Sequence, residues 1–587
     1  MDLRERMGAE GTGAMLKGYD EIVEAVKQSA IAGLLERMGM RSVLGEAVRC
    51  VLFAEERARR RAIHDDYLAC RNTIEAISKD IPAGDPSKPV WMIGSMHTVW
   101  GVKLEGILSI AVRLAGMMPV AVHSTRVKWI ERYHRSFSIE QALFFEKYQG
   151  ETRQGGVSKD DDLLGRVVTM SDLMEVSYRS VDVGRLAVSN HVYKNKFSRL
   201  DLTDQETRIA LWAEIDKARK NVLAAEAMLG ECRPVLGLIL EKGISPFAEI
   251  FGVCVAANIP VVQYVGSQNT NQYIVKRYVF RNRHQHPFSL DDSSWKAAQA
   301  IPWSADQANR LMSEFAESYQ MGTWFNRRYL HQDKKIKSRA EVVGQLGLDP
   351  SKRTAVIFSH VLWDATFFYG TSLFQDYETW LIETVKAACG NAHLNWVIKL
   401  HPDLVWKLKY EKYSGELRDA IAIRSEIGVL PEHVKIVSPD TDISTFSFFQ
   451  VTDVCVTVRG TVGIEMACHG IPVLTAGTGR YSGLGFTLDS DTREEYMRRL
   501  AEAHTIPRLS DEQSGLAQRF AHMLFMKRPW PAESFELVKR PINNVGDPLD
   551  TNIVFRVNEA KQFKNASDMA QFAAWLRSDE VDYVRSV

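Results

Sequence analysis

Short runs of apolar residues alternate along this chain with longer segments in which apolar residues recur at helical spacing. The runs are rich in β-branched residues, which favours buried strands of a parallel sheet. They predict strands at residues 90–93, 119–123, 235–240, 259–264, 354–359, 395–400, 434–437, 454–458 and 473–476. Helices are predicted between them at residues 102–114, 246–257, 377–389, 443–450 and 462–469. Because strands and helices alternate, the pattern predicts an α/β protein with parallel sheets.

The length of 587 residues is too great for one ordinary hydrophobic core. We therefore expect two Rossmann-like domains with a deep cleft between them, and a helical extension at the N-terminus. The expected boundaries are 1–85 for the helical extension, 86–338 for the first domain, 339–540 for the second domain and 541–587 for a C-terminal helical segment. An amphipathic helix at 566–577 is expected to pack this last segment back onto the first domain.

Charge and cysteine content narrow the class of protein. Lys plus Arg equals Asp plus Glu, at 73 each, so the chain lacks the excess basic charge of a nucleic-acid binder. The seven cysteines form no CxxC pair and are expected to be reduced core residues of a cytosolic protein. The first residues do not resemble a signal peptide, and no run of about 18 apolar residues predicts a membrane span.

A basic cluster at Arg57, Arg59, Arg60 and Arg61 lies on a predicted amphipathic helix. Acidic residues interleave with it, so a solvated helix face is the preferred interpretation. Contact with an anionic membrane or with a protein partner is the alternative. We therefore expect a cytoplasmic protein, and a peripheral position at the cytoplasmic face of the membrane stays open.

The strongest local signal is residues 454–478, which read as strand, turn, helix and strand. The turn places Arg459 at the carboxyl end of a strand, where its guanidinium suits a phosphate. Gly460 and Thr461 leave backbone N–H groups at the start of the helix, and Glu465 is placed to accept hydrogen bonds from ribose hydroxyls. An ordinary βαβ turn, with Glu465 serving only the helix dipole, is the alternative.

Polar side chains also follow three other predicted strands of the second domain, and the carboxyl ends of parallel strands share one edge of a sheet. Lys399 and His401 lie on one face by the period of two, which favours a phosphate-binding pair over a lone structural histidine. The polar groups expected to converge on one cleft are His360, Lys399, His401, Asp440, Arg459, Gly460 and Thr461. Thr441, beside Asp440, is also a candidate donor-binding residue.

The first predicted domain offers fewer chemical groups. Gly94, Ser95 and His97 follow its first strand, in the position where open α/β sheets bind ligands, and a structural turn is equally compatible. Glu241 follows a later strand and is a candidate general base. Capping of the next helix, or an ion pair with Lys242, is the alternative for this carboxylate.

Four motifs of the second domain resemble one known family. They are FSHVLWD from Phe358 to Asp364, VIKLHPD from Val397 to Asp403, the loop from Asp440 to Asp442, and RGTVGIEMACHGIPVLTAG from Arg459 to Gly477. These motifs are similar to the nucleotide-sugar-binding half of GT-B glycosyltransferases and, more narrowly, to the bacterial capsule polysaccharide synthesis family, which includes Kdo-transferase-like enzymes. The resemblance covers about residues 340–490 well, extends weakly into the first domain, and does not account for residues 1–80 or 540–587.

The resemblance implies a GT-B fold and a nucleotide-sugar donor. It places the His-Pro motif, which contains His401, on the donor phosphate. It places a small-residue loop and a glutamate at the nucleotide, and these correspond here to Gly460, Thr461, Gly463 and Glu465. CMP-sugar enzymes of this kind often show a Ser/Thr pair where this chain has Arg459-Gly460-Thr461, so CMP, UDP and GDP all stay open as the nucleotide.

The expected activity is therefore transfer of a sugar from a nucleotide-sugar to a surface-polysaccharide or glycan acceptor, free or lipid-linked. Glu241 and His401 are the expected catalytic residues, and the acceptor is expected near Gly94, Ser95 and His97. Fixed cations at the donor phosphate would stabilise the charge that develops on the leaving nucleotide. No cofactor is expected, and these cations make a metal ion redundant, although Asp440-Thr441-Asp442 is formally a DxD motif.

Two other functions remain as alternatives at this stage. One is a nucleotide-sugar epimerase with the same two-domain architecture. The other is a non-catalytic component of polysaccharide assembly, in contact with the inner membrane or with an assembly complex. The transferred sugar (hexosyl, Kdo or sialyl) and the stereochemical outcome stay open, because spacing along the chain does not fix the position of a base relative to the anomeric carbon.

Overall fold

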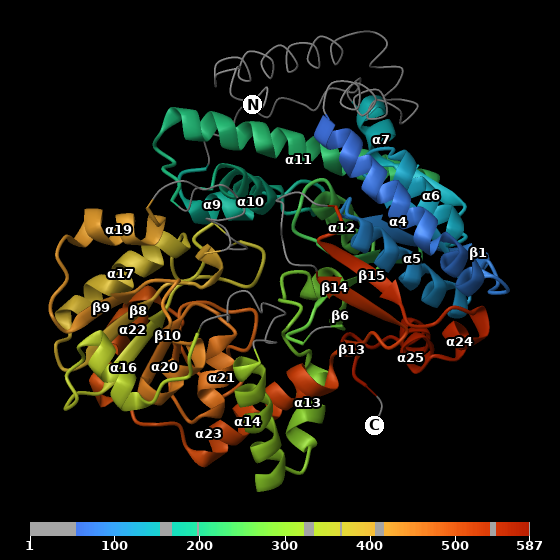
Figure 1. Ribbon diagram of the computed structural model, residues 1–587. Coiled ribbons are helices and arrows are strands. Elements are labelled where there is room, and N and C mark those ends of the chain that lie inside the picture. The colour runs from blue at the N-terminus through green and yellow to red at the C-terminus, as the bar shows by residue number, and fades with distance from the viewer. Residues whose placement is uncertain are drawn as a thin grey trace, which may run out of the picture.

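The structure is a computed structural model that describes residues 54–152, 167–196, 199–269, 271–321, 334–363, 367–405, 416–539 and 548–585. Two α/β bodies lie side by side, each built around one sheet with helices on its faces (Figure 1). Most of the blue-to-green part of the chain forms the first body, and most of the yellow-to-orange part forms the second. The red C-terminal segment lies against the first body. The helices predicted before residue 54, and Asp364 of the FSHVLWD motif, lie outside the described residues.

The first sheet has seven strands in the order β13-β6-β5-β4-β1-β2-β3. Its parallel strands are β1 (Asp85–Gly94), β2 (Met117–His123), β3 (Gln141–Phe144), β4 (Leu236–Ile239) and β5 (Val261–Gly266). Two antiparallel strands, β6 (Gln272–Tyr278) and β13 (Trp530–Pro531), extend the sheet beyond β5. The four central parallel strands coincide with the predicted apolar runs, because helices cover both faces and exclude water from them.

Successive residues of β1 point to opposite faces of this sheet and enter two separate cores. Val90 and Met92 pack on the side of α5 (Val99–Leu114), whereas Trp91 and Ile93 pack on the other side. The other helices on the α5 side are α4 (Ala54–Ser78), α6 (Lys128–Ser136) and α25 (Ser567–Leu576). The helices on the opposite side are α7 (Phe145–Thr152), α9 (Met170–Glu175), α10 (Val183–Asn195), α11 (Gln205–Glu231) and α12 (Phe247–Ala256).

The second sheet has six parallel strands in the order β12-β11-β10-β7-β8-β9. They are β7 (Thr354–Phe358), β8 (Asn395–Lys399), β9 (Val434–Val437), β10 (Val454–Thr457), β11 (Val473–Thr475) and β12 (Leu488–Asp489). One face is covered by α17 (Tyr377–Gly390), α19 (Arg418–Ile427) and α22 (Arg493–Ala501). The other core contains α13 (Asp292–Ala300), α14 (Ala305–Gln320), α16 (Arg339–Leu346), α20 (Thr445–Val451), α21 (Val462–Cys468) and α23 (Asp511–His522).

After α23 the chain returns to the first body through β13. An antiparallel pair of strands follows, β14 (Phe535–Lys539) and β15 (Thr551–Phe555), and then α24 (Ala560–Asn565) and α25. Helix α24 packs on α4, and α25 packs on α5. Near the end of the chain, the carboxylate of Asp582 lies 2.9 Å from both Lys276 Nζ and Arg528 Nη2, and all three side chains are buried. The last segment is therefore joined to the first sheet by buried charges.

The predicted fold class is confirmed, because the chain is α/β with two largely parallel sheets in two Rossmann-like bodies. Six strands of the described ranges were not predicted: β3, β6, β12, β13, β14 and β15. Strand β15 lies in the segment 541–587, which was expected to be helical. Strand β15 forms because it pairs along its length with β14, a contact that its own spacing does not reveal. The domain boundaries given above stay a proposal.

The cysteines agree only in part with the expectation that they are reduced core residues. Six of the seven cysteines lie in the described ranges, and each of these is a free thiol. Cys254, Cys455 and Cys468 are buried, while the other three are partly exposed rather than core residues. Among the helices of the described ranges, none combines the length and the apolar character that a bilayer crossing requires.

Candidate active site between the two sheets

A cavity of about 470 Å³ lies between the two bodies. Its size falls within the roughly 300–1,000 Å³ that is common for small-molecule sites. The first body contributes the end of β5 and the segment His286–Phe288, and α14 contributes Tyr319. The second body contributes residues that follow β7, β8 and β10, together with the start of α21. The cavity is therefore shared by both halves of the chain.

Seven of the predicted site residues line this cavity: His360, Lys399, His401, Arg459, Gly460, Thr461 and Glu465. They come from three strand ends and one helix that together span about a hundred residues of the sequence. They meet because parallel strands bring their carboxyl ends to one edge of the sheet. The structure thus brings these seven residues together, while their chemical roles stay predictions.

Arg459 follows β10 and is only 5% exposed. Its Nη2 donates a hydrogen bond to the carbonyl of Thr371 at 3.0 Å and another to Ser372 Oγ. Its Nε and Nη1 are buried, and neither has a hydrogen-bond partner among the described residues. A buried N–H without a partner is costly, so these two donors mark a place where an anion would be stabilised.

Lys399 is the last residue of β8 and is 2% exposed at the wall of the cavity. Burial, with a smaller contribution from the charge of Lys334, lowers the pKa of Lys399 to about 7. Removal of the ammonium from water favours its neutral form, and an anion in the cavity would reverse that preference. The charge of Lys399 is therefore sensitive both to pH near neutrality and to a bound ligand.

His401 lies two residues beyond Lys399, in the turn that Pro402 begins. Its backbone N–H donates to Ser359 Oγ at 3.0 Å, and its Nδ1 accepts the backbone N–H of Asp403 at 3.2 Å. In the neutral ring this second bond leaves the proton on Nε2. The loop after β8 therefore fixes the tautomer of His401 and makes Nε2 a hydrogen-bond donor.

His360 also lines the cavity, but its Nε2 is engaged by the protein. The backbone N–H of Val458 donates to Nε2 at 3.2 Å, and Thr457 Oγ1 lies 3.2 Å from the same atom. The ring stacks on Tyr377 with centroids 4.5 Å apart. Burial, followed by the charges of His401 and Arg459, holds the pKa of His360 well below its usual value. These contacts tie the end of β7 to the turn that carries Arg459.

Two cavity residues, Arg480 and His286, were missed by the sequence analysis. Arg480 Nη1 donates to Thr461 Oγ1 at 2.7 Å, its Nη2 contacts His286 Nε2, and its Nε is buried without a partner in the described part of the chain. Burial lowers the pKa of Arg480 to about 10. The sequence contains a feature that could have identified each residue as a site candidate. Arg480 follows β11, another strand of the same sheet, and His286 precedes a proline as His401 does.

Glu465 lies one turn into α21 and is 1% exposed. The hydroxyl of Tyr319 donates a hydrogen bond to Glu465 Oε2 at 2.5 Å. This contact crosses from α14 to α21, and both residues line the cavity. The carboxylate therefore has a fixed position at the wall of the cavity.

Three predicted donor-binding residues do not line the cavity. Asp440 is exposed, and Thr441 Oγ1 accepts the backbone N–H of Ile443 at 3.3 Å. Gly463 is buried inside α21, where an added Cβ would lie 2.2 Å from Tyr481 Oη. The glycine at this position is thus explained by close packing against Tyr481. The neighbouring Asp442 accepts a hydrogen bond from Gln345 Nε2 at 2.9 Å and forms an ion pair with Lys337. These contacts hold the loop 440–442 in place.

The predicted residues of the first body also lie outside this cavity. Ser95 Oγ accepts the backbone N–H of Glu241 at 3.1 Å, so the loops after β1 and β4 are adjacent. Glu241 Oε1 accepts the backbone N–H of Gly243 at 2.9 Å and so stabilises its own loop. Gly94 and His97 face a buried histidine, His123, rather than the cavity. Their roles in acceptor binding and catalysis, and that of Glu241, stay predictions.

Two Rossmann-like bodies with a shared cavity at their strand ends define the GT-B fold class. Residues 315–516 match the family model described as capsule polysaccharide biosynthesis protein. The match covers the whole second sheet, including the ends of β7, β8 and β10 that line the cavity. No curated protein matches the chain.

Solved structures give weaker matches. A β-Kdo 2,4-transferase, KpsC, from Thermosulfurimonas dismutans is 11% identical, with 57% of this chain and 88% of that chain covered and a TM-score of 0.29. The β-Kdo 2,7-transferase KpsC from the same organism is 14% identical, with 58% and 87% covered and a TM-score of 0.30. S. aureus MnaA, solved with UDP, is 11% identical, with 75% and 92% covered and a TM-score of 0.25. The fold assignment stands on the two sheets themselves.

Proposed function

We propose that this protein is a glycosyltransferase that holds the phosphate of a nucleotide-sugar in the cavity between the two bodies. One observation carries the proposal. Arg459 and Arg480 present three buried N–H groups without partners among the described residues, in a cavity also lined by Lys399 and His401. Four basic side chains around one space favour a ligand with concentrated negative charge.

Glycosyl transfer makes use of such a site because the leaving nucleotide gains charge as the glycosidic bond breaks. Donors that are already fixed in place stabilise this charge without reorganisation. In the proposal, Arg459 and Arg480 bind the phosphate of the donor, and His401 Nε2–H donates to the oxygen that becomes the leaving group. The cations supply this stabilisation, so no step requires a metal ion.

Glu465 is proposed to bind the ribose of the nucleotide. It lies at the wall of the cavity, and its bond from Tyr319 fixes the carboxylate. A carboxylate is an acceptor-only group and suits the paired hydroxyls of a ribose. The small residues Gly460 and Thr461 leave room for the nucleotide beside it.

The acceptor is proposed to approach from the first body, where the loops after β1 and β4 meet at the Ser95–Glu241 contact. Glu241 is proposed as the general base that takes the proton of the acceptor hydroxyl. Release from its bond to Gly243 would be needed for that role. The family match over residues 315–516 supports a surface polysaccharide as the kind of acceptor.

The proposal is tested with a panel of CMP, UDP and GDP, read by thermal unfolding. A nucleotide that binds only the folded protein raises the melting temperature by mass action. We expect one nucleotide to do so for wild type and for Arg493→Met, an exposed arginine remote from the cavity, and to do so far less for Arg459→Met. Sugars linked to that nucleotide are then assayed for nucleotide release with glycan acceptors.

Three outcomes would count against the proposal. No shift with any nucleotide at millimolar concentration would remove the donor site. Interconversion of two nucleotide-sugars without an acceptor would identify an epimerase. Nucleotide binding without turnover of any donor, unchanged by Glu241→Gln, would identify a non-catalytic component.

The titration of Lys399 gives a prediction for pH dependence. Its pKa in the free protein is lowered to about 7, and a bound phosphate favours the charged form. Below that pH the lysine is already charged. Above it, binding must include uptake of a proton, so nucleotide affinity is expected to fall as pH rises, by up to about tenfold per pH unit.

The measurement is the nucleotide dissociation constant of wild type and of Lys399→Arg between about pH 6 and pH 9. Arginine stays charged over this range, so the ratio of the two constants cancels the titration of the nucleotide itself. A ratio that stays constant with pH would show that Lys399 does not take up a proton when the nucleotide binds.

A further inference from the structure

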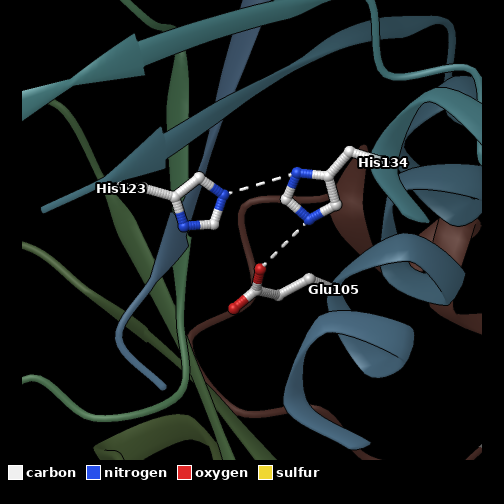
Figure 2. A group of neighbouring side chains, drawn as sticks. All are labelled: Glu105, His123 and His134. Atoms are coloured by element: carbon white, nitrogen blue, oxygen red, sulfur yellow. Dashed lines mark hydrogen bonds and ion pairs between the residues drawn. The ribbon is translucent and has the colours of Figure 1, made fainter. Parts of the chain in front are cut away.

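A cluster of ionisable side chains lies inside the first body, away from the cavity. Glu105 comes from α5, His123 is the last residue of β2, and His134 lies in α6. Figure 2 shows the ring of His134 between the ring of His123 and the carboxylate of Glu105. The three residues are 2–4% exposed. Burial of three such groups together is costly unless each finds a strong partner.

The partners that they have are weak. His123 Nε2 lies 3.4 Å from His134 Nδ1, and His134 Nε2 lies 3.5 Å from Glu105 Oε2. Both contacts are longer than a well-formed hydrogen bond. Apart from their 3.5 Å contact with each other, Glu105 Oε2 and His134 Nε2 are buried without a hydrogen-bond partner among the described residues, and so is His123 Nδ1. The cluster is therefore under-satisfied by the protein alone.

A shared metal ion would need one donor atom from each of these side chains, and the structure brings three such atoms close together. One donor atom from each of the three side chains lies within 4.8 Å of the donor atoms of the other two. Two nitrogen ligands of a tetrahedral zinc ion, each about 2.0–2.1 Å from the metal, are about 3.3 Å apart. The three donors are within 4.8 Å of one another, so side-chain rotations that shorten this distance by up to about 1.5 Å would give the spacing of ligands on one ion.

The backbone around the cluster leaves space for it. Gly94 lies beside His123 in the adjacent strand, and a Cβ at this position would lie 2.4 Å from the imidazole ring and 3.2 Å from Glu105 Oε2. A larger residue at position 94 would therefore displace the cluster. His97, three residues later, packs its ring edge-on to His123 with centroids 5.9 Å apart, and its Nε2 is a fourth buried atom without a partner in the described ranges.

We propose that Glu105, His123 and His134 bind one divalent transition-metal ion, with zinc as the preferred ion, and that the site is structural. Two imidazoles and one carboxylate are a zinc-type donor set, whereas magnesium and calcium prefer oxygen ligands. The ion joins α5, α6 and β2 at the point where the loop 94–98 begins. The ion stabilises this loop. The proposal does not depend on the function of the cavity between the two bodies.

The test begins with wild-type protein purified without immobilised metal or chelator. We expect about one zinc per chain by elemental analysis. After removal of the metal by a chelator, added zinc is expected to raise the melting temperature, and added cobalt is expected to give the visible absorption of a four-coordinate site. These measurements use the intact chain and require no variant.

Variants then locate the ion. Glu105→Gln, His123→Gln and His134→Gln are each expected to weaken zinc binding at least about tenfold. His191→Gln is the matched control, because His191 is also a buried histidine but lies on α10. The proposal is overturned if the metal-free wild type neither binds zinc nor gains stability from it. It is also overturned if the cluster variants keep their zinc, or if His191→Gln loses as much as they do. A cluster variant that does not fold leaves the decision to the wild-type titration.

Discussion

Replacement of His401 by alanine is expected to lower kcat/KM. The expected loss of transition-state stabilisation is about 2–4 kcal/mol, the usual effect of losing one fixed donor to a developing anion. The ring is held by the N–H of Asp403 on Nδ1, so the donor at Nε2 is already oriented before the ligand binds. Its contribution grows as charge develops on the leaving oxygen. The loss should therefore appear mainly in kcat, with a smaller change in the affinity for the free nucleotide.

The matched control is His393→Ala. His393 precedes the same strand at the opposite edge of the sheet and is exposed, so its loss should leave the kinetics unchanged. The melting temperature of His401→Ala should stay close to wild type, because the loop after β8 is partly exposed. Wild-type kcat/KM combined with a sharply lower melting temperature would show that His401 serves the fold rather than the reaction.

Replacement of Asp582 by alanine is expected to lower the free energy of unfolding by about 3–5 kcal/mol, the range seen when one member of a buried ion pair is removed. The carboxylate lies between Lys276 and Arg528, at 2.9 Å from each, and its other oxygen accepts the backbone N–H of Asp291 at 2.8 Å. Without Asp582, two cations would stay buried without a counter-charge.

Chemical denaturation of Asp582→Ala and Asp579→Ala checks this expectation. Asp579 lies three residues earlier in the same segment and is exposed, so its loss should cost little. If the carboxylate matters through its charge, the double variant Lys276→Met, Asp582→Ala should lose less unfolding free energy than the sum of the losses in the two single variants. Equal stability of the two aspartate variants would show that the buried charges are not compensated by Asp582.

The second body was the more predictable half of the chain. Its central strands are mostly apolar, and polar residues stand at their carboxyl ends, so Lys399, His401 and Arg459 could be placed at one edge from the sequence. His286 could not be placed in this way, because it enters the cavity from a loop of the other body. Arg480 follows a short strand in a glycine-rich stretch, where the turn rather than the side chain dominates the pattern.

Strand β6 shows why the first body was harder. It contains Lys276 and Arg277, two cations that argue against a buried strand when only local sequence is considered. The partners that compensate them come from the last helix and the residues after it, about 300 positions later: Asp582 pairs with Lys276, and Arg277 donates to carbonyls near the end of α25. The hydrophobic and polar pattern around β6 does not reveal partners that lie so far away in the sequence.

The return of the chain through β13 fixes the order in which the two bodies can be completed as the protein is synthesised. The second sheet has all its strands once translation passes Asp489, and α23 covers it by His522. The first sheet begins earlier but still lacks β13, and Lys276 lacks its carboxylate until residue 582 has left the ribosome. The body that starts first is therefore finished last, the reverse of the usual order for a chain of two domains. A nascent chain halted before Trp530 should already protect the second sheet from proteolysis while β6 stays open to cleavage.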